Sequence, residues 1–178
     1  MSIDRIVEGW KEIRSGLIEE VSQIPADKFS FRATPETRSV AEVLQHVIES
    51  QKTLVGEAVR PETNLMRQPL EDHAKEYAPE VAGVTDKNAL LELLRSSMET
   101  SATSIKAAEH TLNETGRGLG GRELRKIELV SFAISHEMYH RGQLTVYERL
   151  LQVEPALTRR FRAMTARAAA NKTPQNAS

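Results

Sequence analysis

Hydrophobic residues recur every three or four positions through most of the chain, and this spacing predicts amphipathic helices. The first helix is expected over about residues 2–24, with Ser2 placed to cap its start and Pro25 placed to end it. A second is expected over about residues 36–59, and Pro61 follows it. Each segment carries its large apolar residues on one side, so each is predicted to bury one face against other helices.

An irregular segment that contains three prolines follows the second helix. It covers residues 61–84, and we expect only a short helical turn within it, near residues 70–77. So long a connection in a compact protein usually spans the fold from end to end or covers a site. We therefore interpret this segment as a crossover.

Two further long helices complete the predicted core. The third follows the candidate cap Asp86 and continues to about residue 113. Four glycines within residues 116–121 then break the helical pattern. The fourth helix is expected over about residues 123–152, which is roughly 45 Å at the usual helical rise.

The order of these segments defines the predicted architecture. Pro155 separates a short C-terminal helix, at about residues 156–170, from the fourth helix. No alternation typical of β-strands is found. We predict an all-α four-helix bundle with one long crossover connection, folded as a single domain over residues 1–170, with residues 171–178 as a disordered tail.

Composition and charge narrow the range of functions. Hydrophobic residues make up 39% and charged residues 28% of the chain, as in ordinary globular proteins. Lysine and arginine number 24 against 25 acidic residues, so we expect no nucleic-acid partner, and we interpret the arginines within residues 159–167 as a solvated helix face. No segment is apolar enough for a signal peptide or a membrane span, so we expect a cytoplasmic protein without a membrane partner.

The candidate chemistry depends on histidine, because the chain contains no cysteine. His136 and His140 lie one turn apart on the fourth helix, about 40° from each other on a helical wheel. Both fall within its core stripe. A buried imidazole needs a polar partner, and two stacked rings can each turn one nitrogen to the same ion. Two core histidines with separate hydrogen bonds are the alternative.

The remaining histidines offer a third ligand, and their positions alone do not select it. His46 lies within the second helix, but about 120° from the centre of its apolar stripe. His73 lies in the long connection and could move over a site. His110 follows Glu109 near the end of the third helix, where we expect it to face solvent.

The segment HEMYHRGQL resembles the last bundle helix of the DinB-like superfamily, which carries H-x-x-x-H-R-G-Q. The segment SVAEVLQHVIES is similar to the second helix of that superfamily, which supplies a third histidine. The resemblance covers about residues 1–152. It implies one divalent transition metal, most of all zinc or nickel, held by His46, His136 and His140 with one open position. Because coordinating imidazoles must be neutral, we expect metal loss below about pH 6.

The resemblance also implies a homodimer, and the fourth helix supports this with apolar residues that lie off its histidine face. These residues are Phe132, Ile134, Met138 and Val146. Gly142, which lowers helix propensity, is interpreted as a point of close approach for another helix or subunit. Arg141 is expected to pair with an acidic neighbour.

The superfamily includes transferases that depend on bacillithiol or mycothiol. The resemblance therefore implies a metal-dependent thiol (S-)transferase that acts on a small-molecule substrate, with a low-molecular-weight thiol as cosubstrate. A metal-dependent hydrolase and a non-catalytic, stress-related metal-binding protein remain alternatives, and a substrate-sized cavity open to the metal would favour an enzyme. Gln143, Tyr147 and Glu137 are the candidate catalytic residues, because they lie on or beside the histidine face.

Two shorter motifs are weaker. His136-Glu137-Met138-Tyr139-His140 satisfies H-E-x-x-H, in which Glu137 would be the general base of a zinc peptidase. No strand is predicted to hold a peptide, so we interpret Glu137 as a helix-surface charge or as a group that supports the metal ligands. Gly116, Gly118 and Gly121 spell G-x-G-x-x-G after a helix rather than a strand, which indicates a flexible interhelical turn.

Overall fold

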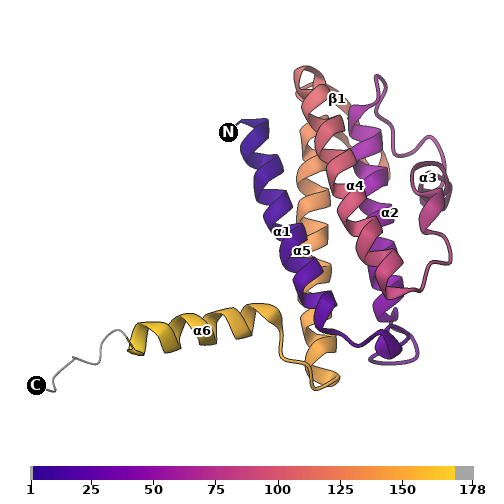
Figure 1. Cartoon of the computed structure of the whole chain (residues 1–178). Coiled ribbons are helices and arrows are strands. Elements are labelled where there is room, and N and C mark those ends of the chain that lie inside the picture. Colours follow the sequence, from indigo (N-terminus) through magenta and orange to yellow (C-terminus); the bar gives the residue numbers. More distant parts are fainter. Residues whose placement is uncertain (1, 171–178) are drawn as a thin grey trace, which may run out of the picture.

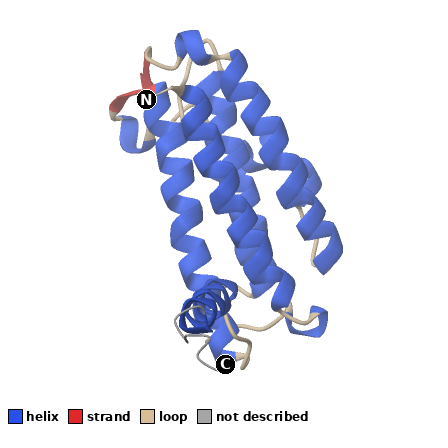
Figure 2. Ribbon diagram, turned by 60° about the vertical axis from the view of Figure 1, so that its left-hand side comes forward, coloured by secondary structure: helices blue, strands red, loops and turns tan. Residues whose placement is uncertain are grey.

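The computed structural model describes residues 2–170, and four long helices pack side by side in this range (Figure 1, Figure 2). The helices are α1 (Ile3–Gln23), α2 (Val40–Val59), α4 (Lys87–Ala107) and α5 (Lys126–Leu150). This arrangement confirms the predicted all-α four-helix bundle. None of the described helices combines the length and the apolar character needed to cross a bilayer. The predicted tail at residues 171–178 lies outside the described residues.

Local hydrogen bonds set the start of α2 four residues later than predicted. Ser39 Oγ accepts a hydrogen bond from the Glu42 amide, and a Glu42 carboxylate oxygen accepts one from the Ser39 amide at 2.7 Å. This reciprocal pair is a capping box, which fixes the first turn of a helix. Short 3-10 turns lie in two of the connections, η1 (Ala26–Lys28) and η3 (Glu109–Thr111).

The glycine-rich connection before α5 is a small β-hairpin rather than a flexible turn. β1 (Thr115–Arg117) pairs antiparallel with β2 (Glu123–Arg125), and the 3-10 turn η4 (Leu119–Gly121) joins them. Gly120 and Gly121 have φ angles of 68° and 75°, a region that favours glycine. Residues 123–125 therefore belong to a strand, and α5 begins at Lys126 rather than at residue 123. Strands of three residues are too short to show alternation, which is why none was predicted.

The long crossover is fixed to α2 by one buried carboxylate. It contains the expected helical turn as α3 (Leu70–Tyr77), followed by the 3-10 turn η2 (Pro79–Val81). Glu57 is fully buried and accepts hydrogen bonds from Arg67 Nε at 2.8 Å and from Tyr77 Oη at 2.7 Å. The crossover therefore forms a fixed outer wall over α2 (Figure 1).

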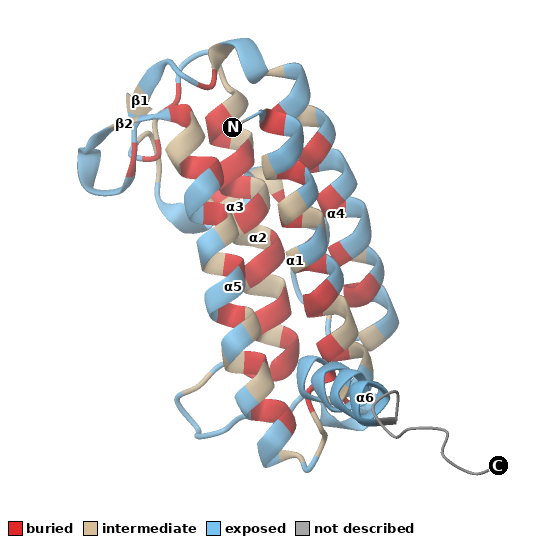
Figure 3. Ribbon diagram, turned by 90° about the vertical axis from the view of Figure 1, so that its left-hand side faces the viewer, coloured by how far each residue is buried: buried red, intermediate tan, exposed pale blue. Residues whose placement is uncertain are grey.

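The core is divided into two apolar clusters, one toward each end of the bundle, and buried residues line the inward faces of the helices (Figure 3). One cluster includes Leu17 and Leu144, and the other includes Leu129 and Trp10. Between the clusters lies a polar layer with one buried polar side chain from each of the four long helices, namely Arg14, Gln51, Ser97 and Glu137.

The C-terminal helix α6 (Ala156–Ala170) has the predicted bounds and projects sideways from one end of the bundle (Figure 1). Buried Glu20 of α1 accepts hydrogen bonds from the amides of Ala156 and Leu157, so a carboxylate caps its first turn. Arg160 pairs with Glu19, in keeping with a solvated arginine face.

Candidate metal centre

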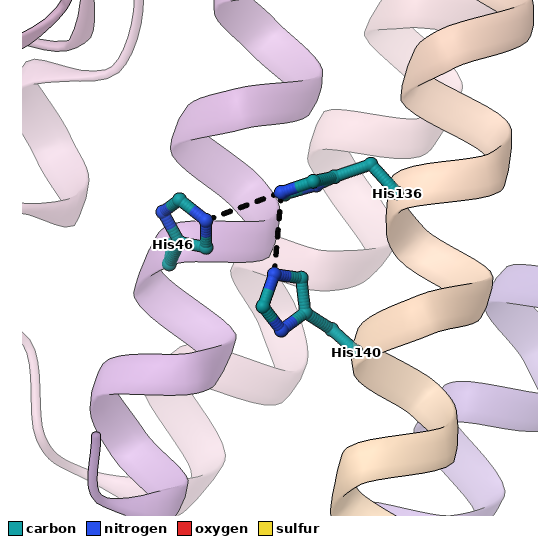
Figure 4. Close-up of side chains that lie close together, drawn as sticks. All are labelled: His46, His136 and His140. Carbon is teal, nitrogen blue, oxygen red and sulfur yellow. Dashed lines mark hydrogen bonds between the residues drawn. The ribbon is translucent and has the colours of Figure 1, made fainter. Parts of the chain in front are cut away.

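Three histidines from two helices direct their rings toward one point (Figure 4). His46 lies on α2, and His136 and His140 lie one turn apart on α5. Nε2 of His136 is 3.2 Å from Nε2 of His46 and 3.2 Å from Nε2 of His140. Two nitrogens that share one tetrahedral ion at about 2.0–2.1 Å are roughly 3.4 Å apart. The three ligand nitrogens also lie within 4.8 Å of one another, so the group could hold a single metal ion.

The centre lies at the seam between α2 and α5 rather than in the middle of the core. His140 is 5% exposed, whereas His46 and His136 are half-buried. The expectation that both α5 histidines occupy the middle of the core stripe is therefore correct only for His140. The position of His46 beside the apolar stripe of α2 is what allows its ring to reach this seam, because α2 packs along α5.

The other two histidines lie elsewhere. His73 is fully buried in α3, where Nδ1 is 3.4 Å from a Glu57 carboxylate oxygen and Nε2 is 3.3 Å from the Leu65 carbonyl oxygen. It is a packed part of the crossover wall rather than a group placed to move over the centre. His110 is exposed on η3, as expected.

The local environment keeps the three imidazoles neutral. Burial, and after it the positive charge of Arg38, lower the pKa of His46 to about 4. Burial, then His140 and Arg38, lower the pKa of His136 to about 4. Burial also lowers the pKa of His140, although its hydrogen bond to Gln143 acts in the opposite direction. Neutral imidazoles present the lone pairs that a metal ion requires.

A chain of hydrogen bonds orients His140. Gln143 Nε2 donates to Tyr147 Oη at 3.2 Å, and the tyrosine hydroxyl donates to the Arg38 carbonyl at 2.8 Å. The carbonyl oxygen of Gln143 therefore faces Nδ1 of His140, 2.9 Å away, and accepts a hydrogen bond from the N–H group there. This leaves Nε2 of His140 as a free lone pair toward the centre. The contacts of Gln143 and Tyr147 thus make them positioning residues.

Glu137 lies in the buried polar layer, so its interpretation as a surface charge is wrong. It is 1% exposed. One carboxylate oxygen accepts from Arg14 Nε at 2.6 Å, and the other accepts from Arg14 Nη2 at 2.8 Å and from Trp10 Nε1 at 2.7 Å. Both oxygens are bound inside the core, so neither is available to a reaction at the centre. This geometry excludes the general-base role that the H-E-x-x-H pattern suggested.

The two residues that follow His140 have different surroundings. Arg141 donates to Glu20 at 3.3 Å, as expected for an acidic partner, and its guanidinium lies over Gly16, where any Cβ would collide with it. Gly142 is exposed, and a Cβ added there would meet no atom within 4 Å. The close approach predicted at Gly142 is therefore not made within the described part of the chain.

A cavity of about 430 Å³ opens beside His46 and His136. This volume lies within the usual range for small-molecule sites. Its apolar wall comes from α2, α3, η4 and α5, and the residues are Leu54, Leu70, Ala74, Leu119 and Phe132. Charged side chains also line it, namely Arg38, Glu49 and Glu71. The candidate centre is thus open to a substrate-sized space.

The second and the last long helices of this bundle bring three imidazoles together beside a cavity. This fold and site define a class of small helical proteins that could hold one metal ion. The sequence profile of the DinB family matches residues 1–173. The chain belongs to the DinB family, which confirms the resemblance seen in the sequence. A comparison with proteins of curated function finds no match.

Solved structures with the same fold include two DinB-like proteins. That from Bacillus subtilis is 22% identical, with a TM-score of 0.62, over 83% of this chain and 92% of that one. That from Bacillus cereus is 14% identical, with a TM-score of 0.64, over 84% and 93%. The mycothiol-dependent maleylpyruvate isomerase is 14% identical, with a TM-score of 0.65, over 81% of this chain and 61% of that one. At these identities the likeness establishes the shared fold alone.

Proposed function

We propose that the protein is a metal-dependent transferase that uses a low-molecular-weight thiol as cosubstrate. The observation that carries this proposal is the convergence of three neutral imidazole nitrogens at the edge of a cavity of about 430 Å³. A divalent ion held by neutral ligands keeps its full charge, and when bound it would lower the pKa of a thiol and supply a nucleophile near pH 7. The similar fold of a mycothiol-dependent isomerase also supports a thiol.

We propose His46, His136 and His140 as the metal ligands, with zinc or nickel as the ion, because imidazole nitrogen suits both metals. The thiol has to come from solution, since the chain has no cysteine. It loses its proton to solvent, and its sulfur forms a bond to an electrophilic carbon of the second substrate. The leaving group departs with the electrons of the broken bond. Gln143 holds His140 in the required tautomer, and the apolar cavity wall packs against the second substrate.

Metal content is the first test of this proposal. Protein purified without chelator should contain close to one equivalent of a divalent transition metal by elemental analysis. Replacing any of the three proposed ligands by alanine should abolish stoichiometric binding. His110→Ala is the matched control, because that histidine is exposed and lies outside the group. Stoichiometric binding by His46→Ala would remove this residue from the ligand set.

Activity is the second test. The full chain, loaded with Zn²⁺ or Ni²⁺, is assayed for loss of monochlorobimane with bacillithiol, mycothiol, glutathione and coenzyme A in turn. We expect turnover with at least one thiol, and we expect chelation or His136→Ala to remove it. Turnover that survives chelation would mean that the chemistry lies elsewhere. Absence of turnover with all four thiols would favour a metal-dependent hydrolase or a non-catalytic metal-binding protein.

We also propose a homodimer that uses the outer face of α5. Met138, Gly142, Val146 and Leu150 recur every four residues there, and the three larger side chains are 45–53% exposed. A glycine within an exposed apolar stripe allows close packing of a second helix. A cytoplasmic location is proposed as well, because reduced thiols are maintained in that compartment.

A further inference from the structure

Arg38 stands beside the candidate metal centre with no ion-pair partner in the described part of the chain. Two contacts fix its backbone. The Arg38 carbonyl accepts a hydrogen bond from the Tyr147 hydroxyl, and the next residue, Ser39, is the N-cap of α2. Its side chain is exposed and has no hydrogen-bond or ion-pair partner among residues 2–170. Arg38 lines the same cavity as His46 and His136. The guanidinium is therefore close enough to act on a molecule bound at the centre.

Exposed apolar side chains from three separate segments gather on the same cavity as Arg38. Leu70 of α3, Leu119 of η4 and Phe132 of α5 are 54%, 46% and 44% exposed. All three line this cavity, and the Phe132 ring centroid is 5.9 Å from that of His136. Exposed apolar residues that converge on a hollow are typical of a ligand site. The cavity thus offers an apolar surface and the Arg38 guanidinium to the same molecule.

Two carboxylates also line the cavity and must be weighed against Arg38. Glu71 is 77% exposed and lies 3.8 Å from Lys75, which offsets part of its charge. Glu49 is half-buried, and burial raises its pKa while Arg38 lowers it. A divalent ion and Arg38 together carry three positive charges, against at most two negative charges from Glu49 and Glu71. The metal-loaded site therefore favours an anion over a neutral molecule or a cation.

We infer that Arg38 is a specificity-determining residue that binds the carboxylate, or a similar anionic group, of a substrate whose apolar part packs against Leu70, Leu119 and Phe132. A guanidinium suits this role because it binds a carboxylate through two parallel hydrogen bonds. The inference rests on the proposed function in treating the ligand as a substrate. The binding itself requires neither a thiol nor turnover, so the two proposals can fail separately.

The test is binding of a matched pair of probes to the zinc-loaded full chain, measured by calorimetry. The probes are 4-phenylbutanoate and its neutral amide. We expect Arg38→Gln to weaken carboxylate binding about tenfold, which corresponds to about 1.4 kcal/mol, and to leave amide binding unchanged. Arg38→Lys should keep part of the preference, and high salt should reduce it. A competition experiment with each thiol identifies the source of the anionic group. A thiol that displaces the bound carboxylate probe would place the anionic group on the cosubstrate, and a probe that stays bound would place it on the electrophile.

Matched variants make the result specific. Arg95→Gln removes an exposed arginine of α4 that does not line this cavity, and its binding should stay within about twofold of the wild type. Glu49→Gln should strengthen carboxylate binding, because it removes a like charge. Phe132→Ala should weaken both probes. Because the Arg38 side chain has no hydrogen-bond or ion-pair partner among the described residues, thermal unfolding of Arg38→Gln should match that of the wild type.

Two results would overturn the inference. One is carboxylate binding by Arg38→Gln that is as tight as that of the wild type. The other concerns the preference for the carboxylate over the amide. If the Arg38→Gln variant keeps this preference when zinc is bound and loses it when zinc is removed, the ion rather than Arg38 binds the carboxylate. Arg38-dependent binding without any thiol turnover would uphold the inference and count against the transferase. Thiol-dependent turnover by the wild type, together with an unchanged carboxylate preference in Arg38→Gln, would support the transferase and count against the inference.

Discussion

The side-chain oxygen of Gln143 lies 2.9 Å from Nδ1 of His140, and this contact determines which ring nitrogen of the histidine faces the candidate metal centre. Gln143 is itself held by Tyr147, so its oxygen and nitrogen cannot exchange places without loss of a hydrogen bond. The expected effect of Gln143 is therefore on metal affinity, through the tautomer of His140.

Gln143→Ala should weaken zinc binding by about tenfold or more, because His140 would no longer be held with its lone pair toward the ion. Competition with a chromophoric chelator measures the change. Ser135→Ala is the control, since that exposed hydroxyl bonds only to the Phe132 carbonyl on the same helix. Equal affinity for wild type and Gln143→Ala would show that the contact does not support the ligand.

The metal-free protein should lose stability as the pH falls from about 6.5 to about 4. The folded-state pKa values of His46 and His136 are about 4, below the ordinary value of 6.5, so the unfolded chain binds more protons within this window. The loss should be about 1–2 kcal/mol for each of these half-buried histidines. Urea unfolding at several pH values measures it, and His46→Gln should show a shallower dependence over the same window.

The same pKa values revise the expected pH limit for metal binding. The sequence suggested loss of metal below about pH 6, on the basis of ordinary imidazoles. Histidines that stay neutral to about pH 4 compete less with protons. Zinc affinity should therefore change little between pH 8 and pH 6, and metal titrations should show the main loss nearer pH 5. A steep fall already at pH 7 would contradict the lowered pKa values.

Alkaline pH should destabilise the protein where the end of α5 and the start of α6 pack against α1. Glu148 is fully buried, and burial together with the charge of Glu20 raises its pKa to about 8 from 4.5. The folded chain binds more protons than the unfolded chain between these values, so stability falls as the pH rises through that range. Glu148→Gln should raise the free energy of unfolding at pH 9 by about 2 kcal/mol and change it little at pH 5. Glu12→Gln, at an exposed site, should show no such difference.

Light scattering at micromolar concentration should give twice the chain mass of 19.9 kDa if the outer face of α5 joins two copies. Val146→Asp should then yield monomers, because a charge on a buried apolar interface is unfavourable. Phe161→Ser on α6 is the control, as it removes an exposed apolar side chain outside that face. A monomeric wild type would contradict the proposed dimer.

The helices were predictable because a 3.6-residue period leaves a strong signal over 20 or more positions. His46 was not predictable in this way. A helical wheel measures each position against its own helix, and the ring of His46 meets its partners at a seam between two helices. Only the resemblance of its segment to the DinB-like superfamily pointed to it. The hairpin before α5 was missed because strands of three residues carry too little pattern.

Glu137 was misread because its partners are distant in sequence. Arg14 and Trp10 lie more than 120 positions away. A signal was nevertheless present, since Trp10, Arg14 and Leu17 follow one another at helical spacing and place a charge on the buried stripe of the first helix. A buried arginine needs an acidic partner on a facing helix, and Glu137 lies near the core face of its own helix.

The polar layer also aligns the helices along their length. Nη2 of Arg14 donates to Gln51 of α2 at 2.7 Å and to Glu137 of α5 at 2.8 Å, so one guanidinium ties the two helices that carry the histidines. Gln51 lies five residues after His46, and Glu137 is next to His136. A shift of α2 along α5 by one turn, about 5.4 Å, would leave a buried charge without its partner. The same shift would move the imidazole of α2 away from the two imidazoles of α5. The register that keeps the core neutral is therefore the register that brings the three nitrogens within reach of one ion.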